Sequence, residues 1–280
     1  MSDANAGNTG WSDMMKRSGQ IALFAFCLFA AFWGTGCSDE AEIMGAEQLL
    51  NQAYASANEG RWEDAMRFSA QAYQLRPDNT AVRLMQAFAL ENNARENEAL
   101  EISRMAADDE RSFLAQYTYG RMLFQRKRYE QAQGYLKKAL ELKKDDFNTL
   151  LMLQQSAARL RQHAENQNLC RELMNRYGEK CGKDFKTYIY NELALNILSG
   201  VSNIGRGTKG KLEKIFALAV NSSPSSPELA WNQAVFYEYY LKDFPTAKKH
   251  YERFLQLTEK YSGMEKERAA VKERLYKSGK

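Results

Sequence analysis

The sequence predicts an all-α protein made of stacked helix pairs, and three observations lead to this prediction. Ala and Leu, which favour helices, number 64 of the 280 residues, whereas Val and Ile, on which strands rely, number only 12. The chain contains only 17 Gly and 4 Pro, so few positions interrupt a helix. Small residues also recur at a fixed interval, which is typical of repeat architectures. Together these features exclude a sheet protein.

The charge and the reactive residues exclude several classes of function. A net charge of +4, spread along the chain, does not indicate nucleic-acid binding. Four Cys and two His leave little material for a metal site, and we expect His163 and His250 to be solvated helix residues. No arrangement of Ser, His and Asp or of Cys and His suggests a catalytic site. We therefore predict a protein that is not an enzyme, with no cofactor, no metal and no small-molecule substrate.

Residues 1–36 are predicted to be an export signal. Lys16 and Arg17 form a short basic region, and an unbroken apolar run follows over residues 21–33. As a helix this run is about 20 Å long, short of the ~30 Å hydrocarbon core of a bilayer, so it is more typical of a secretory signal than of a membrane span. Met14 and Met15 directly precede the basic region, and one of them is an alternative translation start to Met1.

Cys37 follows the apolar run after three small residues. Thr35, Gly36 and Cys37 resemble the lipobox of bacterial lipoproteins, although Gly34 stands where an aliphatic residue is usual. The resemblance implies that Cys37 is diacylated through its sulfur and becomes the mature N-terminus, with residues 37–45 as a short tether. The residue after Cys37 is Ser instead of Asp, which favours the outer membrane over the inner one. An uncleaved membrane anchor is the alternative.

Further along the chain, small residues mark the places where two helices are expected to cross. Three trios repeat the same gaps of 12 and 7 residues, and the middle members of successive trios lie 34 and 33 residues apart. Two helices pack about 8–10 Å apart only where small side chains separate them, which explains this recurrence. The trios are Ala53, Ala65 and Ala72; Ala87, Ala99 and Ala106; and Gly120, Ala132 and Ala139.

This spacing resembles the tetratricopeptide repeat (TPR). Gly60 and Trp62 occupy the turn inside the first unit, Tyr129 occupies the same place in the third, and Pro77 closes the first unit. The resemblance implies a right-handed superhelical solenoid of about six TPR-like helix pairs. A solenoid needs a polar element over its last apolar face, and the charged segment 262–280 is predicted to be a capping helix and tail.

The predicted repeat array covers residues 46–261. Its fourth unit is degenerate, because Gln154, Asn166 and Leu173 occupy the small-residue places. Its fifth unit has a long internal turn over residues 199–210. The six units are 46–79, 80–112, 113–146, 147–177, 187–226 and 228–261.

Two weaker signals lie in the later units. Residues 205–211 match the Gly and Lys spacing of a phosphate-binding loop, but Leu212 replaces the Ser or Thr that binds Mg²⁺, and no strand precedes the segment. We expect a basic loop there. Cys170 and Cys181 would meet an oxidising compartment after export. They either form a disulfide, which would stabilise the fold by roughly 3 kcal/mol in the chain-entropy treatment, or remain two free thiols.

In TPR proteins the first helix of each unit lines a concave groove, and this register implies a partner site. The implied groove residues are Leu50, Tyr54, Leu84, Phe88, Tyr117, Arg121 and Phe124, with Glu91, Leu151, Gln155, Asn232, Phe236 and Tyr239 at equivalent places. An aromatic groove suits a peptide with apolar anchors, and Arg121 is placed to pair with one acidic group. The alternative is that these aromatic residues pack on their neighbours.

Together these features predict a non-catalytic, lipid-anchored scaffold or assembly factor of the bacterial cell envelope. We expect it to face the periplasm, from the outer membrane in preference to the inner one, and to bind a protein or peptide partner in the groove. In plan it is similar to repeat-bearing envelope lipoproteins such as the pilotins. Two alternatives stay open: a docking module on an uncleaved membrane anchor, and an accessory subunit that recruits an envelope enzyme.

Overall fold

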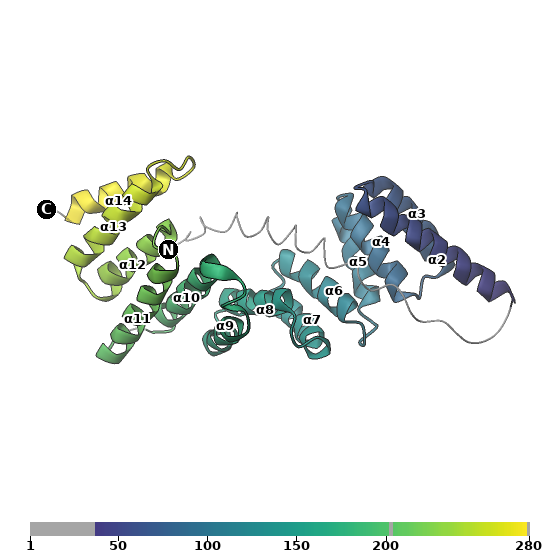
Figure 1. Cartoon of the computed structure of the whole chain (residues 1–280), viewed down its shortest axis with the longest axis horizontal. Helices are drawn as coiled ribbons and strands as arrows, with labels where there is room; N and C mark the ends of the chain where they lie inside the picture. Colours follow the sequence, from purple (N-terminus) through teal and green to yellow (C-terminus); the bar gives the residue numbers. More distant parts are fainter. Residues whose placement is uncertain (1–36, 202–203, 279–280) are drawn as a thin grey trace. The chain divides into compact units, whose positions relative to one another are not determined.

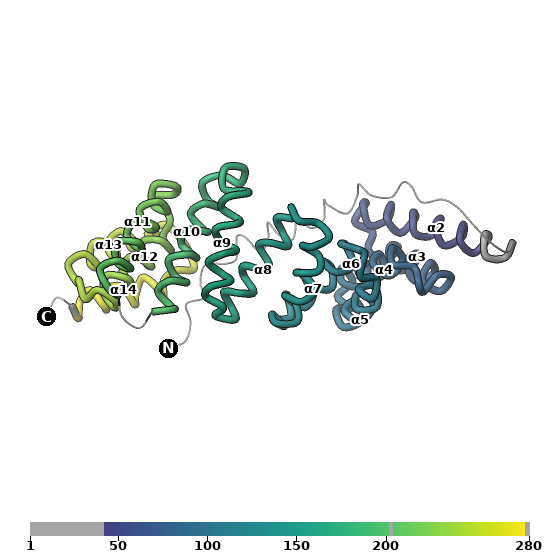
Figure 2. The backbone as a smooth tube through the Cα atoms, turned by 90° about the horizontal axis from the view of Figure 1, so that it is seen from below, coloured from purple at the N-terminus to yellow at the C-terminus, as the bar shows by residue number. Residues whose placement is uncertain are grey.

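The computed structural model describes residues 37–201 and 204–278, so the predicted export signal over 1–36 lies outside the described residues. The described part confirms the all-α prediction, with antiparallel helices that follow one another in chain order (Figures 1 and 2). Within these ranges the helices are α2 (Cys37–Asn58), α3 (Trp62–Leu75), α4 (Thr80–Asn92), α5 (Glu96–Ala106), α6 (Phe113–Gln125), α7 (Tyr129–Leu142), α8 (Phe147–Arg159), α9 (His163–Tyr177), α10 (Gly182–Ser199), α11 (Arg206–Ser222), α12 (Pro227–Val235), the π-helical turn η1 (Phe236–Tyr240), α13 (Phe244–Thr258) and α14 (Glu265–Ser278).

Polar cap residues determine where several first helices begin. Asn79, Ser112 and Asp146 each accept a hydrogen bond from a backbone N–H in the first turn of α4, α6 and α8. A cap of this kind satisfies an N–H group that has no partner inside the helix and contributes about 1 kcal/mol. These three helices therefore begin at the first residues of the units delimited above as 80–112, 113–146 and 147–177.

Small residues separate the helices of each pair. All eight Ala residues of the three trios are at most 1% exposed, and Gly120 is buried as well. A Cβ atom added to Gly120 would lie 2.9 Å from Cγ of Leu136, so α6 and α7 approach more closely than an alanine would allow. The expected positions of the helix crossings thus agree with the packing.

Two segments differ from their expected form. Residues 37–45, expected as a tether, are helical, because α2 begins at Cys37. Ile43, Ala46 and Leu50 continue the helical spacing of the buried face of α2, and Ala46 is already buried, so packing extends the helix toward its N-terminus.

The second difference concerns the internal turn of the fifth unit. It is shorter than the expected 199–210, because α11 already begins at Arg206. The Gly-rich basic segment therefore forms the first turns of a helix instead of a loop. Glycines inside a helix cost about 1 kcal/mol each, but Leu212, Ile215 and Phe216 anchor α11 in a core cluster shared with α10 and α12.

The capping helix predicted at the C-terminal end is α14, which lies alongside α13 (Figure 1). Its Val271 is fully buried against a cluster that includes Ala247, Tyr251 and Phe254. Arg268 of α14 also donates to the backbone oxygen of Thr258 over 2.6 Å. The helix thereby covers the apolar face that the sixth pair would otherwise leave open.

Candidate functional site

Two predicted groove aromatics lie half-buried against other rings. Phe88 of α4 contacts Trp62 edge to face, with ring centroids 5.2 Å apart. Phe124 of α6 contacts Tyr129 in the same geometry over 5.4 Å. Both rings therefore pack on a neighbouring ring, as the alternative named above expected. Part of each ring remains accessible to solvent.

Tyr117 and Arg121 lie one turn apart on α6, and both have partners within the chain. Tyr117 stacks on Phe113 with centroids 5.7 Å apart, and burial raises the pKa of Tyr117 to about 12. Arg121 donates to both carboxylate oxygens of Glu91 on α4, over 2.8 and 2.5 Å. Arg121 is therefore engaged by Glu91 and is not held open for an acidic group of a partner. The two side chains are 19% and 22% exposed.

The other predicted groove residues divide between the core and its edge. Leu50 and Tyr54 are half-buried beside a core cluster of α2, α3 and α4. Phe236 is buried, and it is the first residue of the π-helical turn over residues 236–240. The predicted groove residues that are instead part of the core are Leu84, Leu151 and Phe236.

Gln155 and Tyr239 link neighbouring elements through hydrogen bonds. Gln155 Nε2 donates to the hydroxyl of Tyr188 on α10 over 3.4 Å. Tyr239 is 50% exposed, and its hydroxyl accepts from Arg274 of the capping helix over 2.9 Å. Both side chains therefore remain at the surface but are oriented by contacts within the chain.

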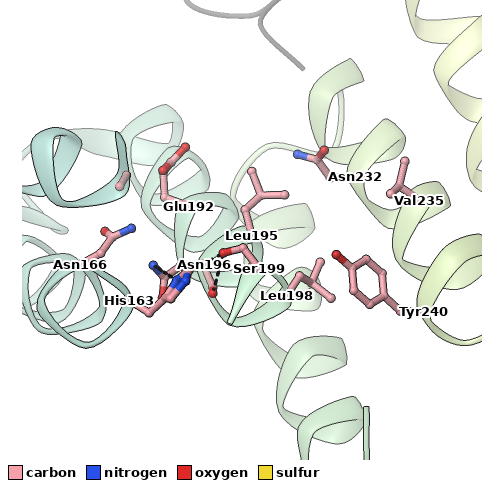
Figure 3. A pocket seen from close by; sticks show the side chains of 11 residues that line it. His163, Asn166, Glu192, Leu195, Asn196, Leu198, Ser199, Asn232, Val235 and Tyr240 are labelled. Carbon is pink, nitrogen blue, oxygen red and sulfur yellow. Dashed lines mark hydrogen bonds between the residues drawn. The ribbon is translucent and has the colours of Figure 1, made fainter. Parts of the chain in front are cut away.

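A pocket of about 280 Å³ lies between α9, α10 and α12 (Figure 3). Helix α10 supplies more of its wall than any other element, because Glu192, Leu195, Asn196 and Ser199 follow the spacing i, i+3, i+4, i+7 and share one side of the helix. We call it the α10 pocket, and its lining residues are Ala158, His163, Asn166, Glu192, Leu195, Asn196, Leu198, Ser199, Asn232, Val235 and Tyr240.

The pocket belongs to the surface on which the groove was expected. Leu195 directly follows the buried Ala194, as Phe88 follows Ala87 in the second unit. Asn232, which was named among the groove residues, also lines the pocket. We call the surface shared by these residues of the first helices the first-helix face.

One polar atom in the pocket wall lacks a partner. His163 Nδ1 lies 3.4 Å from Asn196 Nδ2 and 3.4 Å from Ser199 Oγ, so with Nδ1 as acceptor the Asn196 amide donates to it. Asn196 Oδ1 is buried and has no hydrogen-bond partner among the described residues. Since more than about 90% of buried polar groups are hydrogen-bonded, we expect a donor at this oxygen, from a water molecule or from a ligand.

The pocket also holds a carboxylate without a cationic partner. Glu192 is half-buried, and in the described part of the chain no Lys or Arg lies within 4.0 Å of it. Burial raises the pKa of Glu192, while the Gln154 amide and the charge of Arg159 act in the opposite direction. Placing this side chain in the pocket therefore has an electrostatic cost that an incoming cation would reduce.

Sequence reasoning missed most of this pocket. It treated His163 as a solvated helix residue, whereas His163 is half-buried and bonded to α10. The repeat register, extended to the helix crossing at Ala194, could have placed Leu195 and Ser199 on the groove side of α10. No sequence signal identifies the unpartnered oxygen of Asn196, because it depends on how α9 and α10 pack.

Cys170 and Cys181 are free thiols in the structure, which corresponds to the second of the two alternatives. Cys170 is buried with its Sγ 3.3 Å from Asn166 Oδ1, and burial raises the pKa of this thiol to about 12. Cys181 is exposed before the first residue of α10. Because Cys170 points into the helix pair, the two sulfurs do not meet.

The described residues contain no group of three or more His, Cys, Asp or Glu side chains placed to hold a metal ion. None of the helices within them is both long enough and apolar enough to cross a bilayer. Cys37 is described only as the first residue of α2, so its predicted lipidation rests on the sequence.

No protein-family profile and no curated protein matches this sequence. Solved structures do share its fold. PilF of Pseudomonas aeruginosa superposes with a TM-score of 0.57 at 16% identity, covering 84% of this chain and 99% of PilF. YrrB, described as a TPR protein with an unusual peptide-binding site, gives 0.55 at 15% identity over 69% of this chain and 93% of its own.

The protein MamA gives a TM-score of 0.54 at 15% identity, covering 66% of this chain and 94% of MamA. At such identities the likeness concerns the fold alone. The paired antiparallel helices, their buried small residues and these neighbours agree on one architecture. This chain has the fold of a tetratricopeptide-repeat protein.

Proposed function

We propose that this protein is a non-catalytic scaffold that binds a segment of a protein partner on its first-helix face, at the α10 pocket. The TPR fold is one that serves protein–protein binding, and YrrB, with the same fold, is described as having a peptide-binding site. The single observation that carries the proposal is the buried Asn196 Oδ1, which has no partner among the described residues and belongs to a side chain in the wall of an open pocket.

A peptide segment suits this surface better than a rigid apolar ligand would. Its backbone N–H groups are donors at regular spacing, and one of them can satisfy an acceptor such as Asn196 Oδ1. Leu195, 36% exposed, offers apolar contact area beside that oxygen. Peptide recognition commonly combines such backbone hydrogen bonds with pockets for side chains.

Site-directed photocrosslinking tests the proposal. A photoreactive amino acid at Leu195 should crosslink a partner that is then identified by mass spectrometry, whereas the same residue at Gln131, an exposed position on α7, should not. A synthetic peptide of the crosslinked segment should then bind the purified protein saturably. Its affinity should fall roughly 10-fold or more for Leu195→Glu, since a buried contact is lost and a charge is placed against it.

The control is Gln131→Glu, which introduces the same charge on a second helix. Each variant needs a circular-dichroism melt to show that it is folded. Crosslinks that form only from Gln131, or peptide binding that Leu195→Glu leaves unchanged, would place the partner elsewhere and end the proposal.

We further propose that the scaffold is anchored through a lipid on Cys37 and faces the periplasm, from the outer membrane. The support is the sequence: the basic region, the apolar run and the Thr-Gly-Cys order that resembles a lipobox. Since residues 37–45 are helical, they span only about 13 Å, and a lipid at Cys37 would hold the array close to the bilayer.

Metabolic labelling with a radioactive fatty acid tests the anchor. The parent chain should be labelled, and Cys37→Ser should lose the label and accumulate as an unprocessed precursor. Cys27→Ser, which removes another cysteine of the same leader, should be labelled like the parent. Normal labelling and processing of Cys37→Ser would refute the anchor. Membrane fractionation of the parent tests the second part of the proposal, because it shows whether the protein is in the outer or the inner membrane.

A further inference from the structure

Several hydrogen-bond donors of the α10 pocket already have acceptors within the protein. Asn196 Nδ2 donates toward His163, and Asn232 Nδ2 donates to Asn191 Oδ1 over 2.9 Å. Ser199 Oγ donates to the backbone oxygen of Asn196 over 3.0 Å. The Asn196 and Asn232 amides and the Ser199 hydroxyl thus donate within the protein, whereas Asn196 Oδ1 and the Glu192 carboxylate are acceptors in the pocket wall.

The two acceptors lie on one side of α10, and side chains of α12 and η1 face them across the pocket. Asn196 Oδ1 on α10 has no partner among the described residues. The Glu192 carboxylate lies one turn before it on the same side of α10, because the two residues are four apart. Figure 3 shows Asn232 and Tyr240 pointing from α12 and η1 toward this side of α10. A ligand that meets both acceptors must therefore present more than one donor.

The charge in the pocket is negative. Glu192 is the only charged residue in the lining, and in the described ranges no cation pairs with it. Arg159 on α8 and Glu228 near the start of α12 act on Glu192 from farther away and with opposite signs. A positively charged group entering the pocket would compensate the charge of the buried carboxylate. Its effect would exceed those of Arg159 and Glu228, because it would lie closer to Glu192.

The remaining wall is apolar and aromatic. Leu195, Leu198 and Val235 line the pocket beside the ring of Tyr240, which is 37% exposed. A guanidinium suits this mixture, because it is planar, carries five N–H donors, is weakly hydrated and packs its face on aromatic rings. An ammonium group is more strongly hydrated and concentrates its donors at one point.

We propose that the α10 pocket receives the guanidinium of an arginine side chain in the bound partner segment. The inference rests on the proposed function and adds the chemistry of the residue that is recognised. In the complex the guanidinium donates to Glu192 and to Asn196 Oδ1, and the arginine stem packs on Leu195.

Methyl NMR of the full chain in detergent micelles, labelled with ¹³C at the leucine methyl groups, tests the proposal. The probe is N-acetyl-arginine methylamide, which carries the side chain and two peptide bonds. The Leu195 methyl signals should shift saturably, whereas those of Leu218, 46% exposed on α11 and outside the pocket, should not. Leu195→Ile assigns the signal.

Three further probes show whether binding depends on the charge of the ligand, on its shape, or on its being a peptide side chain. The citrulline analogue has the same shape without the charge, and it should bind roughly 10-fold or more weakly. The lysine analogue should also bind more weakly than arginine. Spermidine represents a free polyamine; if it binds as tightly as the arginine probe, the occupant is not a peptide side chain and the proposal fails.

Two variants locate the interaction. Glu192→Gln should weaken the arginine probe roughly 10-fold, because a charge-assisted contact is lost. Glu141→Gln, which removes an exposed carboxylate on α7, should leave binding unchanged. Equal binding of the citrulline probe, unchanged binding by Glu192→Gln, or no saturable shift at Leu195 would each overturn the proposal.

The outcome is distinguishable from failure of the proposed function. If crosslinking from Leu195 captures a segment whose peptide binds at the pocket while the arginine probe does not bind, the scaffold function stands and arginine recognition is wrong. If crosslinks form only from Gln131, the first-helix face is not the partner surface.

Discussion

Gln154 of α8 donates a hydrogen bond from Nε2 to Oδ1 of Asn166 on α9 over 2.9 Å. The two residues occupy the places that Ala87 and Ala99 hold in the second helix pair, and they are 0% and 1% exposed. The fourth pair thus replaces a crossing of two small residues by two amides joined by a hydrogen bond. This explains why a unit that is degenerate in sequence keeps the helix lengths of its neighbours.

Removing the Gln154 amide should leave the buried Asn166 Oδ1 with only the weak thiol donor of Cys170, and it also removes an acceptor of the Tyr188 hydroxyl. Gln154→Ala should lower the free energy of unfolding by about 1–3 kcal/mol, measured by urea denaturation. In the double variant with Asn166→Ala, the loss should be smaller than the sum of the two single losses, with a coupling of roughly 0.5–2 kcal/mol. Additive losses would mean that the two amides do not depend on each other.

The contact between Gly120 and Leu136 predicts the effect of a single methyl group. A Cβ at Gly120 would meet Leu136 Cγ at 2.9 Å and its backbone N at 3.2 Å, so Gly120→Ala should destabilise the protein by about 1–3 kcal/mol. Gly134 on the exposed side of α7 has no heavy atom within 4 Å of the added Cβ. Gly134→Ala should therefore stabilise by about 0.5–1 kcal/mol, because alanine favours the helix. Thermal melts of the two variants should move in opposite directions.

The Arg121–Glu91 ion pair joins α6 to α4 and is mostly shielded from solvent. Glu91→Gln should reduce the free energy of unfolding by roughly 1–3 kcal/mol, since Arg121 keeps its charge but loses its bidentate partner. Glu101→Gln removes an exposed pair with Arg104 on a single helix and should change nothing measurable. Equal effects of the two substitutions in urea denaturation would contradict a structural role of the Arg121 pair.

Cys170 and Cys181 should differ sharply in reactivity. Because the thiolate is the reactive form, the buried Cys170, whose pKa is raised to about 12, should resist iodoacetamide in the native protein. The exposed Cys181 should be alkylated readily, and both should react after unfolding in guanidinium chloride. Peptide mapping by mass spectrometry measures each site. A peptide in which Cys170 and Cys181 are joined would show that the disulfide forms after all.

His250 should make stability depend on pH. It stacks on Tyr237 with ring centroids 5.3 Å apart, and burial, followed by the charges of Arg253 and Lys249, lowers its pKa. The unfolded chain then binds a proton more readily than the folded one, so this contribution is complete above pH ~6.5 and is lost as the pH falls below it. His250→Gln should therefore lose less stability than the parent between pH 7.5 and 5.5 in parallel melts. Parallel losses in the two proteins would show that His250 is not the group responsible.

Much of the fold is local and could be predicted. Helical content follows from the preference of Ala and Leu for helices, and Ala65, Ala99 and Ala132 recur because each helix crossing has the same steric requirement. The cap residues Asn79 and Ser112 act within a few residues of their own position. Small residues at helix crossings and polar residues at helix starts recur in successive units, so the sequence alone predicts them.

The candidate site was predictable only in part. The repeat register places Phe88, Tyr117 and Arg121 on the first helices, but it does not show which neighbours they contact. Phe236 is buried where the π-helical turn over 236–240 begins, and no local sequence pattern predicts this turn.

The sequence by itself determined that the chain is helical, that it repeats, and which residues lie where paired helices cross, because each of these depends on residues close together in one unit. Only the tertiary structure decided that Glu91 engages Arg121, that Gln154 pairs with Asn166, and that Asn196 Oδ1 is left without a partner. The pairing of Glu91 with Arg121 joins residues 30 positions apart, and that of Gln154 with Asn166 joins two helices of one pair. Their geometry depends on how neighbouring helices stack, which no single segment encodes.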